Sequence, residues 1–217
     1  MFKIIFCYAV TVGFQERAMP YTPEHKQRTR RKIVRSAARL FNRKGFAEVS
    51  IGEIMTAAGL THGGFYRHFA NKEELYAEAV RHFLNKEAPA RWQKGPKGPS
   101  KPDLPFAKYV IDAYLSRDHL EDVEGACPLI GLSSDVARSN GTVKAAYREV
   151  AESMIQAFMA NMKGRAAREQ AIVLVVLCVG GMVLARALDD EVLVDDLLSY
   201  AHKHALSTTG WATSRQS

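Results

Sequence analysis

The sequence predicts an all-α protein with a small basic N-terminal unit and a larger, electrically neutral helical unit. From Glu24 to Lys44 the apolar residues recur at i, i+4, i+7 and i+8, which is the spacing of one helix face. Residues 24–86 hold thirteen Lys or Arg against six Asp or Glu, whereas the other residues hold seventeen of each sign. A neutral body with a charged head indicates an anionic partner rich in phosphate.

The composition is that of a globular protein in a reducing compartment. Of the 217 residues 47% are hydrophobic, which is ample for a core. Three cysteines, Cys7, Cys127 and Cys178, are too few and too widely spaced for a disulfide framework or a zinc site. We therefore expect a cytoplasmic protein with no metal and no cofactor.

Residues 1–19 form an apolar extension that the helical pattern does not include. A secretory signal would also need a small-residue cleavage site, which is not visible. The run Phe2 to Phe14 is shorter than the roughly 20 residues that span a bilayer. A short strand remains an alternative, but we expect Met19 to be the natural start and residues 1–18 to be upstream sequence or a loose arm.

Four helices are predicted in the basic unit. Ile33, Ala37, Leu40 and Phe41 form the inner face of the first, which Gly45 ends. Ser50 caps a second helix in a capping box with Glu53, and its inner face is Ile51, Ile54, Met55 and Ala58.

Gly59 separates the second helix from a short third one. Thr61 is expected to cap that third helix, which runs to about Phe69 with Phe65 and Phe69 on its buried side. Asn71 caps the fourth, which continues to about Lys86.

The rest of the chain predicts a loop followed by five more helices. Residues 91–105 contain four prolines and two glycines, which exclude helix and strand. The helices are expected at about 104–119, 126–139, 141–163, 165–188 and 190–206. We divide the chain into an extension (1–19), a basic helical domain (20–70), a connecting helix (71–90), the loop (91–105) and a C-terminal helical domain (106–207).

The second and third helices have the pattern of a helix-turn-helix. In this motif the second helix enters the major groove of DNA while the first lies across the backbone. Ala57-Ala58-Gly59-Leu60 forms the turn, and Thr61 to Phe69 form the recognition helix. Gly63 and Gly64 are poor helix formers, costing about 1 kcal/mol each. Their presence makes sense where the backbone approaches DNA closely.

The region from Ile33 to Leu84 resembles the DNA-binding domain of the TetR family of transcriptional regulators. The matching motifs are Ala38-Arg39-Leu40-Phe41, Gly45-Phe46, Ser50-Ile51-Gly52-Glu53-Ile54, Ala58-Gly59-Leu60, Gly63-Gly64-Phe65-Tyr66-Arg67-His68-Phe69 and Asn71-Lys72-Glu73-Glu74-Leu75. The resemblance implies a helical homodimer that represses transcription from an inverted-repeat operator until a small-molecule effector binds its C-terminal domain.

Ten residues of the basic unit are candidates for binding double-stranded DNA. Thr61 and His62 begin the recognition helix, the resemblance makes Tyr66 a phosphate contact, and Lys72 opens the next helix, whose N-terminus attracts phosphate. The full set is Arg30, Ser50, Thr61, His62, Gly63, Gly64, Tyr66, Arg67, His68 and Lys72. The remaining arginines of the first helix are expected to steer the protein onto DNA together.

The C-terminal domain offers an effector pocket and a dimer interface. Candidates for an apolar pocket are Tyr109, Tyr114, Cys127, Tyr147, Met154 and Phe158. The stretch Ala171 to Ala185 is apolar on every side, which predicts that a partner subunit covers one face. The candidate interface residues are Val175, Cys178, Val179, Met182, Leu184, Leu197, Leu198 and Ala201.

Three alternatives to an effector-released repressor stay open. Cys127 at the start of a helix could make the protein a thiol or electrophile sensor, although Glu121, Asp122 and Glu124 would raise the pKa of its thiol. An enzyme is disfavoured because no nucleotide loop, nucleophile elbow or HExxH motif is present. A membrane-associated basic protein would use residues 1–14 for insertion, whereas we expect no membrane partner.

Overall fold

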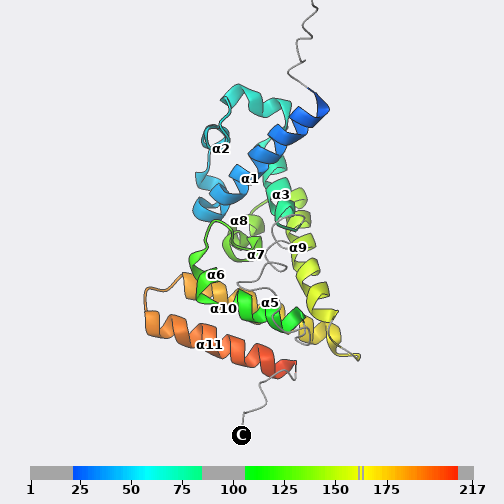
Figure 1. The fold of residues 1–217 in the computed structure, drawn as a ribbon, viewed down its shortest axis with the longest axis vertical. Coiled ribbons are helices and arrows are strands. Elements are labelled where there is room, and N and C mark those ends of the chain that lie inside the picture. The colour runs from blue at the N-terminus through cyan, green and yellow to red at the C-terminus, as the bar shows by residue number, and fades with distance from the viewer. Residues whose placement is uncertain (1–21, 85–105, 161, 163, 210–217) are drawn as a thin grey trace, which may run out of the picture.

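The computed structural model describes residues 22–84, 106–160, 162 and 164–209, and all of its regular elements are helices. Four of them form the head at the top of Figure 1: α1 (Pro23–Glu48), α2 (Ile51–Ala57), the 3₁₀ helix η1 (His62–Arg67) and α3 (Lys72–His82). The body comprises α5 (Phe106–Tyr114), α6 (Arg117–Glu121), α7 (Pro128–Gly131), α8 (Ser133–Ala137), α9 (Gly141–Met159), α10 (Ala167–Arg186) and α11 (Glu191–Thr208). The predicted extension and the predicted loop lie outside the described residues.

The helix starts in the head follow from capping residues that the sequence predicts. The Ser50 side chain accepts a hydrogen bond from the Glu53 N–H at 3.1 Å, and Asn71 Oδ1 accepts one from the Glu74 N–H at 2.8 Å. The third helix differs from the expectation. It is a 3₁₀ helix ending at Arg67, and the Thr61 side chain makes no cap hydrogen bond. Two successive glycines explain the weak helix, because they lower α-helical propensity.

Two long helices predicted in the body are each broken in two. The stretch expected at 104–119 divides into α5 and α6 because Ser116 starts a new helix, accepting a hydrogen bond from the His119 N–H at 3.2 Å. The stretch expected at 126–139 divides into α7 and α8 at Leu132. The predictions for α9, α10 and α11 are correct to within a few residues.

The base of the body is a layer of α5, α10 and α11, and α9 runs from this layer up to α3 in the head (Figure 1). Helix α10 buries Ala171, Leu174, Cys178, Met182 and Ala185, which are spaced three or four residues apart and so share one face. Its contact with α11 is close, because a Cβ added to Gly181 would lie 3.1 Å from Ala201 Cβ.

Head and body meet at the end of α1 as well as between α3 and α9. The helix is interrupted at Gly45, which has φ +81° and ψ 167°. The next residue, Phe46, donates its backbone N–H to Asp135 Oδ2 of α8 at 2.7 Å. One turn earlier, Asn42 Nδ2 donates to the carbonyl oxygens of Glu124 and Ala126 at 3.1 and 2.9 Å. These bonds attach the end of α1 to the segment 124–135 of the body.

We expect alanine at Gly45 to lower the free energy of unfolding by about 1–3 kcal/mol, since this backbone conformation suits only glycine. The added Cβ would also lie 3.0 Å from Asp135 Oδ2. Gly59 is the matched control: its φ is +69°, but a Cβ there meets nothing within 4 Å. Urea unfolding followed by circular dichroism should show a larger loss for Gly45→Ala than for Gly59→Ala. Equal losses would contradict a role for the close approach of Asp135.

Candidate nucleic-acid interface

The recognition helix η1 buries one side in the head and presents the other to solvent. Phe65 and Phe69 are buried, and their rings stack at a centroid distance of 5.7 Å. Thr61 and His62 are exposed, and Tyr66 exposes 63% of its surface. The apolar side therefore anchors the helix, and three side chains able to form hydrogen bonds lie on its outer surface.

Nothing in the described part of the chain requires a glycine at the position of Gly63. Its φ is not in the left-handed region, and a Cβ built on it would meet nothing within 4 Å. At neighbouring Gly64 a Cβ would lie 3.5 Å from Met55 Cε, an ordinary van der Waals contact. The missing side chain at Gly63 therefore exposes bare backbone beside Thr61, His62 and Tyr66.

A groove of about 480 Å³ lies between the start of α1 and η1. It is lined by His25, Lys26, Thr29, Met55, Leu60, Thr61, Gly63, Gly64, Arg67 and His68. Burial lowers the pKa of His68, and the nearby charges of Lys26, Arg30 and Arg67 lower it further. The groove is therefore positive, and its positive charge comes from lysine and arginine side chains.

The structure turns two candidate DNA contacts, Arg30 and Lys72, toward the interior of the head. The guanidinium of Arg30 binds the Glu74 and Glu78 carboxylates of α3 and the carbonyl oxygen of His68. The ammonium of Lys72 donates to the Phe46 carbonyl oxygen and lies 4.3 Å from the centre of the Phe46 ring. Burial lowers the pKa of Lys72. Both side chains thus link segments of the head.

Sequence reasoning missed these inward roles because the partners are distant in the chain. Glu74 and Glu78 lie 44 and 48 positions from Arg30. The available signal was their spacing, since two acids four residues apart share one helix face. Ser50, a third candidate, serves as the N-cap of α2.

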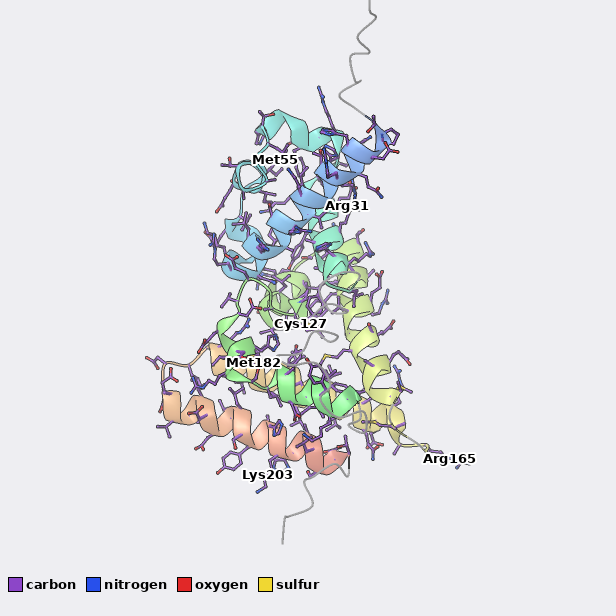
Figure 2. All side chains as sticks on the ribbon, in the orientation of Figure 1. Arg31, Met55, Cys127, Arg165, Met182 and Lys203 are labelled. Carbon is purple, nitrogen blue, oxygen red and sulfur yellow. The ribbon has the colours of Figure 1, made fainter. Side chains whose placement is uncertain are left out.

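A row of five exposed cations runs along α1 on the side opposite its buried face. At roughly 100° per residue these positions fall within about a third of the helix circumference. The row, called the α1 ridge below, consists of Arg28, Arg31, Lys32, Arg35 and Arg39. Figure 2 labels Arg31 on this helix.

Four acids near the α1 ridge pair with cations outside it. Glu74 and Glu78 pair with Arg30, whereas Glu53 pairs with Lys44 at 2.6 Å. At the joint with the body, Glu124 pairs with Arg43 at 3.0 Å. The positive charge of the ridge is therefore available to an external anion.

In the body, the structure brings together three of the six candidate pocket residues. Tyr114 and Cys127 are buried, and burial together with the Cys127 thiol raises the pKa of Tyr114 well above its usual value. Tyr147 donates from its hydroxyl to the Leu129 carbonyl oxygen at 3.1 Å, and burial raises its pKa to about 12, with Cys127 contributing. Figure 2 shows Cys127 between the head and the base layer.

The other three pocket candidates differ in burial: Phe158 is buried, whereas Tyr109 and Met154 are half-buried. The two cysteines among the described residues are poor candidates for thiolate chemistry. Cys127 exposes only 2% of its surface, and burial raises the pKa of Cys178.

The outer faces of α10 and α11 are unusually apolar. The described residues include ten exposed large hydrophobic side chains, and eight of these lie between residues 172 and 200: Ile172, Val173, Val176, Leu184, Leu188, Val192, Leu193 and Tyr200.

The eight candidate interface residues divide by burial. Leu184 is exposed, Val175, Val179, Leu197 and Ala201 are half-buried, and Cys178, Met182 and Leu198 are buried in their own subunit. The last three face the core of the chain, because the apolar stretch has an inner as well as an outer side.

Two further observations bear on the kind of site present. Within the described ranges, α10 is the one helix that is long and apolar enough to cross a membrane. Core helices of globular proteins can have the same length and composition. No group of three or more His, Cys, Asp or Glu that could hold a metal ion occurs in those ranges.

Comparison with known proteins identifies the head. The family described as bacterial regulatory proteins, tetR family, matches residues 33–79. The HTH-type transcriptional regulator AcrR of Shigella flexneri is 44% identical over 57 residues, covering 26% of each chain. The HTH-type transcriptional regulator TtgR of Pseudomonas putida is 43% identical over 54 residues, covering 25% of this chain and 26% of that protein. The matched stretch thus spans about a quarter of the length of these relatives.

Solved structures extend the likeness of fold to the body. A TetR transcriptional regulator from Chloroflexus aurantiacus J-10-FL superposes with a TM-score of 0.68 at 24% identity, over 85% of this chain and 95% of that one. The reduced form of E. coli NemR superposes with a TM-score of 0.66 at 16% identity, over 83% and 96%. The helix-turn-helix head therefore matches the tetR family of bacterial regulatory proteins, and the fold of head and body together is that of the solved TetR regulators.

Proposed function

We propose that this protein is a cytoplasmic transcriptional repressor that binds an inverted-repeat DNA operator as a homodimer and is released by a small-molecule effector. The head matches the tetR family over residues 33–79, and the named relatives are transcriptional regulators rather than enzymes. The concentration of positive charge in residues 24–86 supports DNA as the anionic partner.

The observation that supports this proposal most strongly is the bare backbone at Gly63. Nothing within the described chain requires a glycine there, whereas a base edge in the major groove would. Thr61 and His62 lie beside it and would read base edges, and exposed Tyr66 would contact phosphate. Arg67 and His68 line the adjacent groove, where a phosphate of the same strand would lie.

The N-terminus of α3 offers a phosphate contact through its backbone. The Lys72 ammonium is bound to Phe46, so the helix dipole and the N–H groups of the first turn would supply the attraction. The α1 ridge would act at longer range by steering the head toward DNA and adding affinity that does not depend on sequence.

The effector would bind in the body near Tyr114, Cys127 and Tyr147. This cluster adjoins the segment 124–135, to which Asn42 and Phe46 of α1 are hydrogen-bonded. A ligand that shifted this segment would therefore move the end of α1. Such a movement would change the distance between the two recognition helices of a dimer and so weaken operator binding.

The first test selects duplexes from a random pool with the full chain, and we expect an inverted repeat with half-sites spaced by the helical repeat of B-DNA. Gly63→Ala should fold at least as well as the parent, because alanine favours helix by about 1 kcal/mol. It should nevertheless weaken binding to the selected duplex by about tenfold or more. Gly141→Ala, another open position but in the body, is the control. Unchanged binding by Gly63→Ala would contradict the placement of η1 in the groove.

The second test concerns the α1 ridge. A triple variant with Arg31, Arg35 and Arg39 changed to Gln should bind selected and scrambled duplexes more weakly by the same factor. The difference should fade as salt rises toward about 1 M, where the screening length is about 3 Å. The control removes the same charge from the body, at exposed Lys144, Arg148 and Arg168. Equal weakening by the control would show that only net charge matters.

The third test concerns assembly through α10 and α11. Leu184→Asp places a charge in the apolar outer face and should dissociate the dimer, because burying an unpaired carboxylate is costly. Sedimentation velocity should show a monomer, and operator binding should fall with it. Val123→Asp is the control, since Val123 is an exposed apolar residue outside this face. An intact dimer for Leu184→Asp would count against this interface.

A further inference from the structure

We propose that Arg30 is a positioning residue that sets the orientation of the recognition helix from inside the head without contacting DNA. This inference rests on the proposed DNA-binding function. It assigns to Arg30 a role in specificity, whereas a phosphate contact would give it a role in affinity alone.

The geometry joins three segments of the head through one guanidinium. Arg30 Nε donates to both carboxylate oxygens of Glu78 at 3.1 and 3.0 Å, and Nη2 donates to Glu74 Oε1 at 3.2 Å. Nη1 donates to the carbonyl oxygen of His68, the C-cap residue of η1. The guanidinium carbon also lies 4.0 Å from the centre of the Phe69 ring. Thus α1, the end of η1 and α3 meet at one side chain.

The recognition helix needs this external support because its own structure is weak. It is a six-residue 3₁₀ helix with two glycines, and Thr61 provides no side-chain cap. Arg30 satisfies a carbonyl at its C-terminal end and places a positive charge there, which complements the helix dipole. Glu74 extends the link by accepting the Ala70 N–H at 2.7 Å.

Only arginine can make this set of contacts. Its planar fork presents five N–H donors and can lie over an aromatic ring while it binds two carboxylates. A lysine ammonium has the same charge but donates from a single nitrogen. Arg30→Lys therefore distinguishes a phosphate contact from a positioning role. A phosphate contact would largely survive this change, whereas the combined contacts of Arg30 with Glu74, Glu78 and His68 would not.

Glu78→Gln provides a second test, because electrostatics and positioning predict different effects of this variant on DNA binding. Removing an acid makes the head more positive, so charge alone predicts equal or tighter DNA binding. Loss of the Glu78 carboxylate weakens the hold on Arg30, so positioning predicts poorer discrimination. This variant also keeps the test decisive if Arg30→Lys does not fold.

The experiment measures affinity for a duplex selected by the parent protein and for a scrambled duplex, across a range of salt concentrations. We expect Arg30→Lys and Glu78→Gln to lower the ratio of the two affinities by about tenfold or more, comparable to losing a base-pair contact. Arg148→Lys, at an exposed arginine of α9 outside the proposed DNA-binding surface, is the matched control and should keep the ratio. The salt dependence on the scrambled duplex should stay unchanged in all three variants.

A destabilised reference separates positioning from general loss of stability. Leu40→Ala removes buried volume from α1 ten residues away from Arg30, and it should lower the melting temperature while keeping the affinity ratio. The inference is overturned if Arg30→Lys and Glu78→Gln keep the parent ratio. It is also overturned if Arg30→Gln reduces the salt slope by about 0.9, the signature of one lost phosphate contact. If the parent selects no duplex at all, the proposed function fails and this inference fails with it.

Discussion

The backbone of Phe46 is a constraint on which the arrangement of head and body depends. Its N–H donates to Asp135 of the body, and its carbonyl accepts from Lys72 of the head. Gly45 makes this possible by interrupting α1, which leaves the next N–H free of the helix pattern. The Phe46 ring then packs on Phe41 and Tyr76 at centroid distances of 5.6 and 4.6 Å. A hydrogen-bonded joint surrounded by aromatic rings holds the head at a defined angle to α8.

The charged side chains of the head fall into two groups according to their partners. Three carboxylates that could screen the arginines of the surface are bound elsewhere: Glu53 by Lys44, and Glu74 and Glu78 by Arg30. The cations therefore form two groups, one that ties helices together from within and one that remains on the surface. The two groups look alike in the sequence. A mutation in the first removes contacts between helices of the head, whereas a mutation in the second removes surface charge.

Local features of the fold could be predicted from the sequence, whereas features created by long-range contacts could not. Ser50 and Asn71 cap helices through atoms three residues away, so a short pattern suffices to find them. The inward turn of Arg30 depends on α3, more than forty residues later, and no local pattern encodes that meeting. The break at Ser116 was missed because apolar spacing continues across it, and a cap inside a periodic stretch looks like an ordinary polar residue. In the candidate site, the exposed residues of η1 were predictable from helical periodicity, but the open space around Gly63 was not.

The proposed DNA-reading residues are separate from the groups that hold the head together, and this separation affects how the sequence can diverge. Thr61, His62 and Tyr66 contribute little to the core, since their side chains lie mainly in solvent. Substitutions there cost little stability, because surface positions tolerate change. Operator preference could therefore drift between related proteins by single substitutions while Arg30, Gly45 and Phe46 preserve the scaffold. A gene duplicate of this protein would need few steps to acquire a new DNA target.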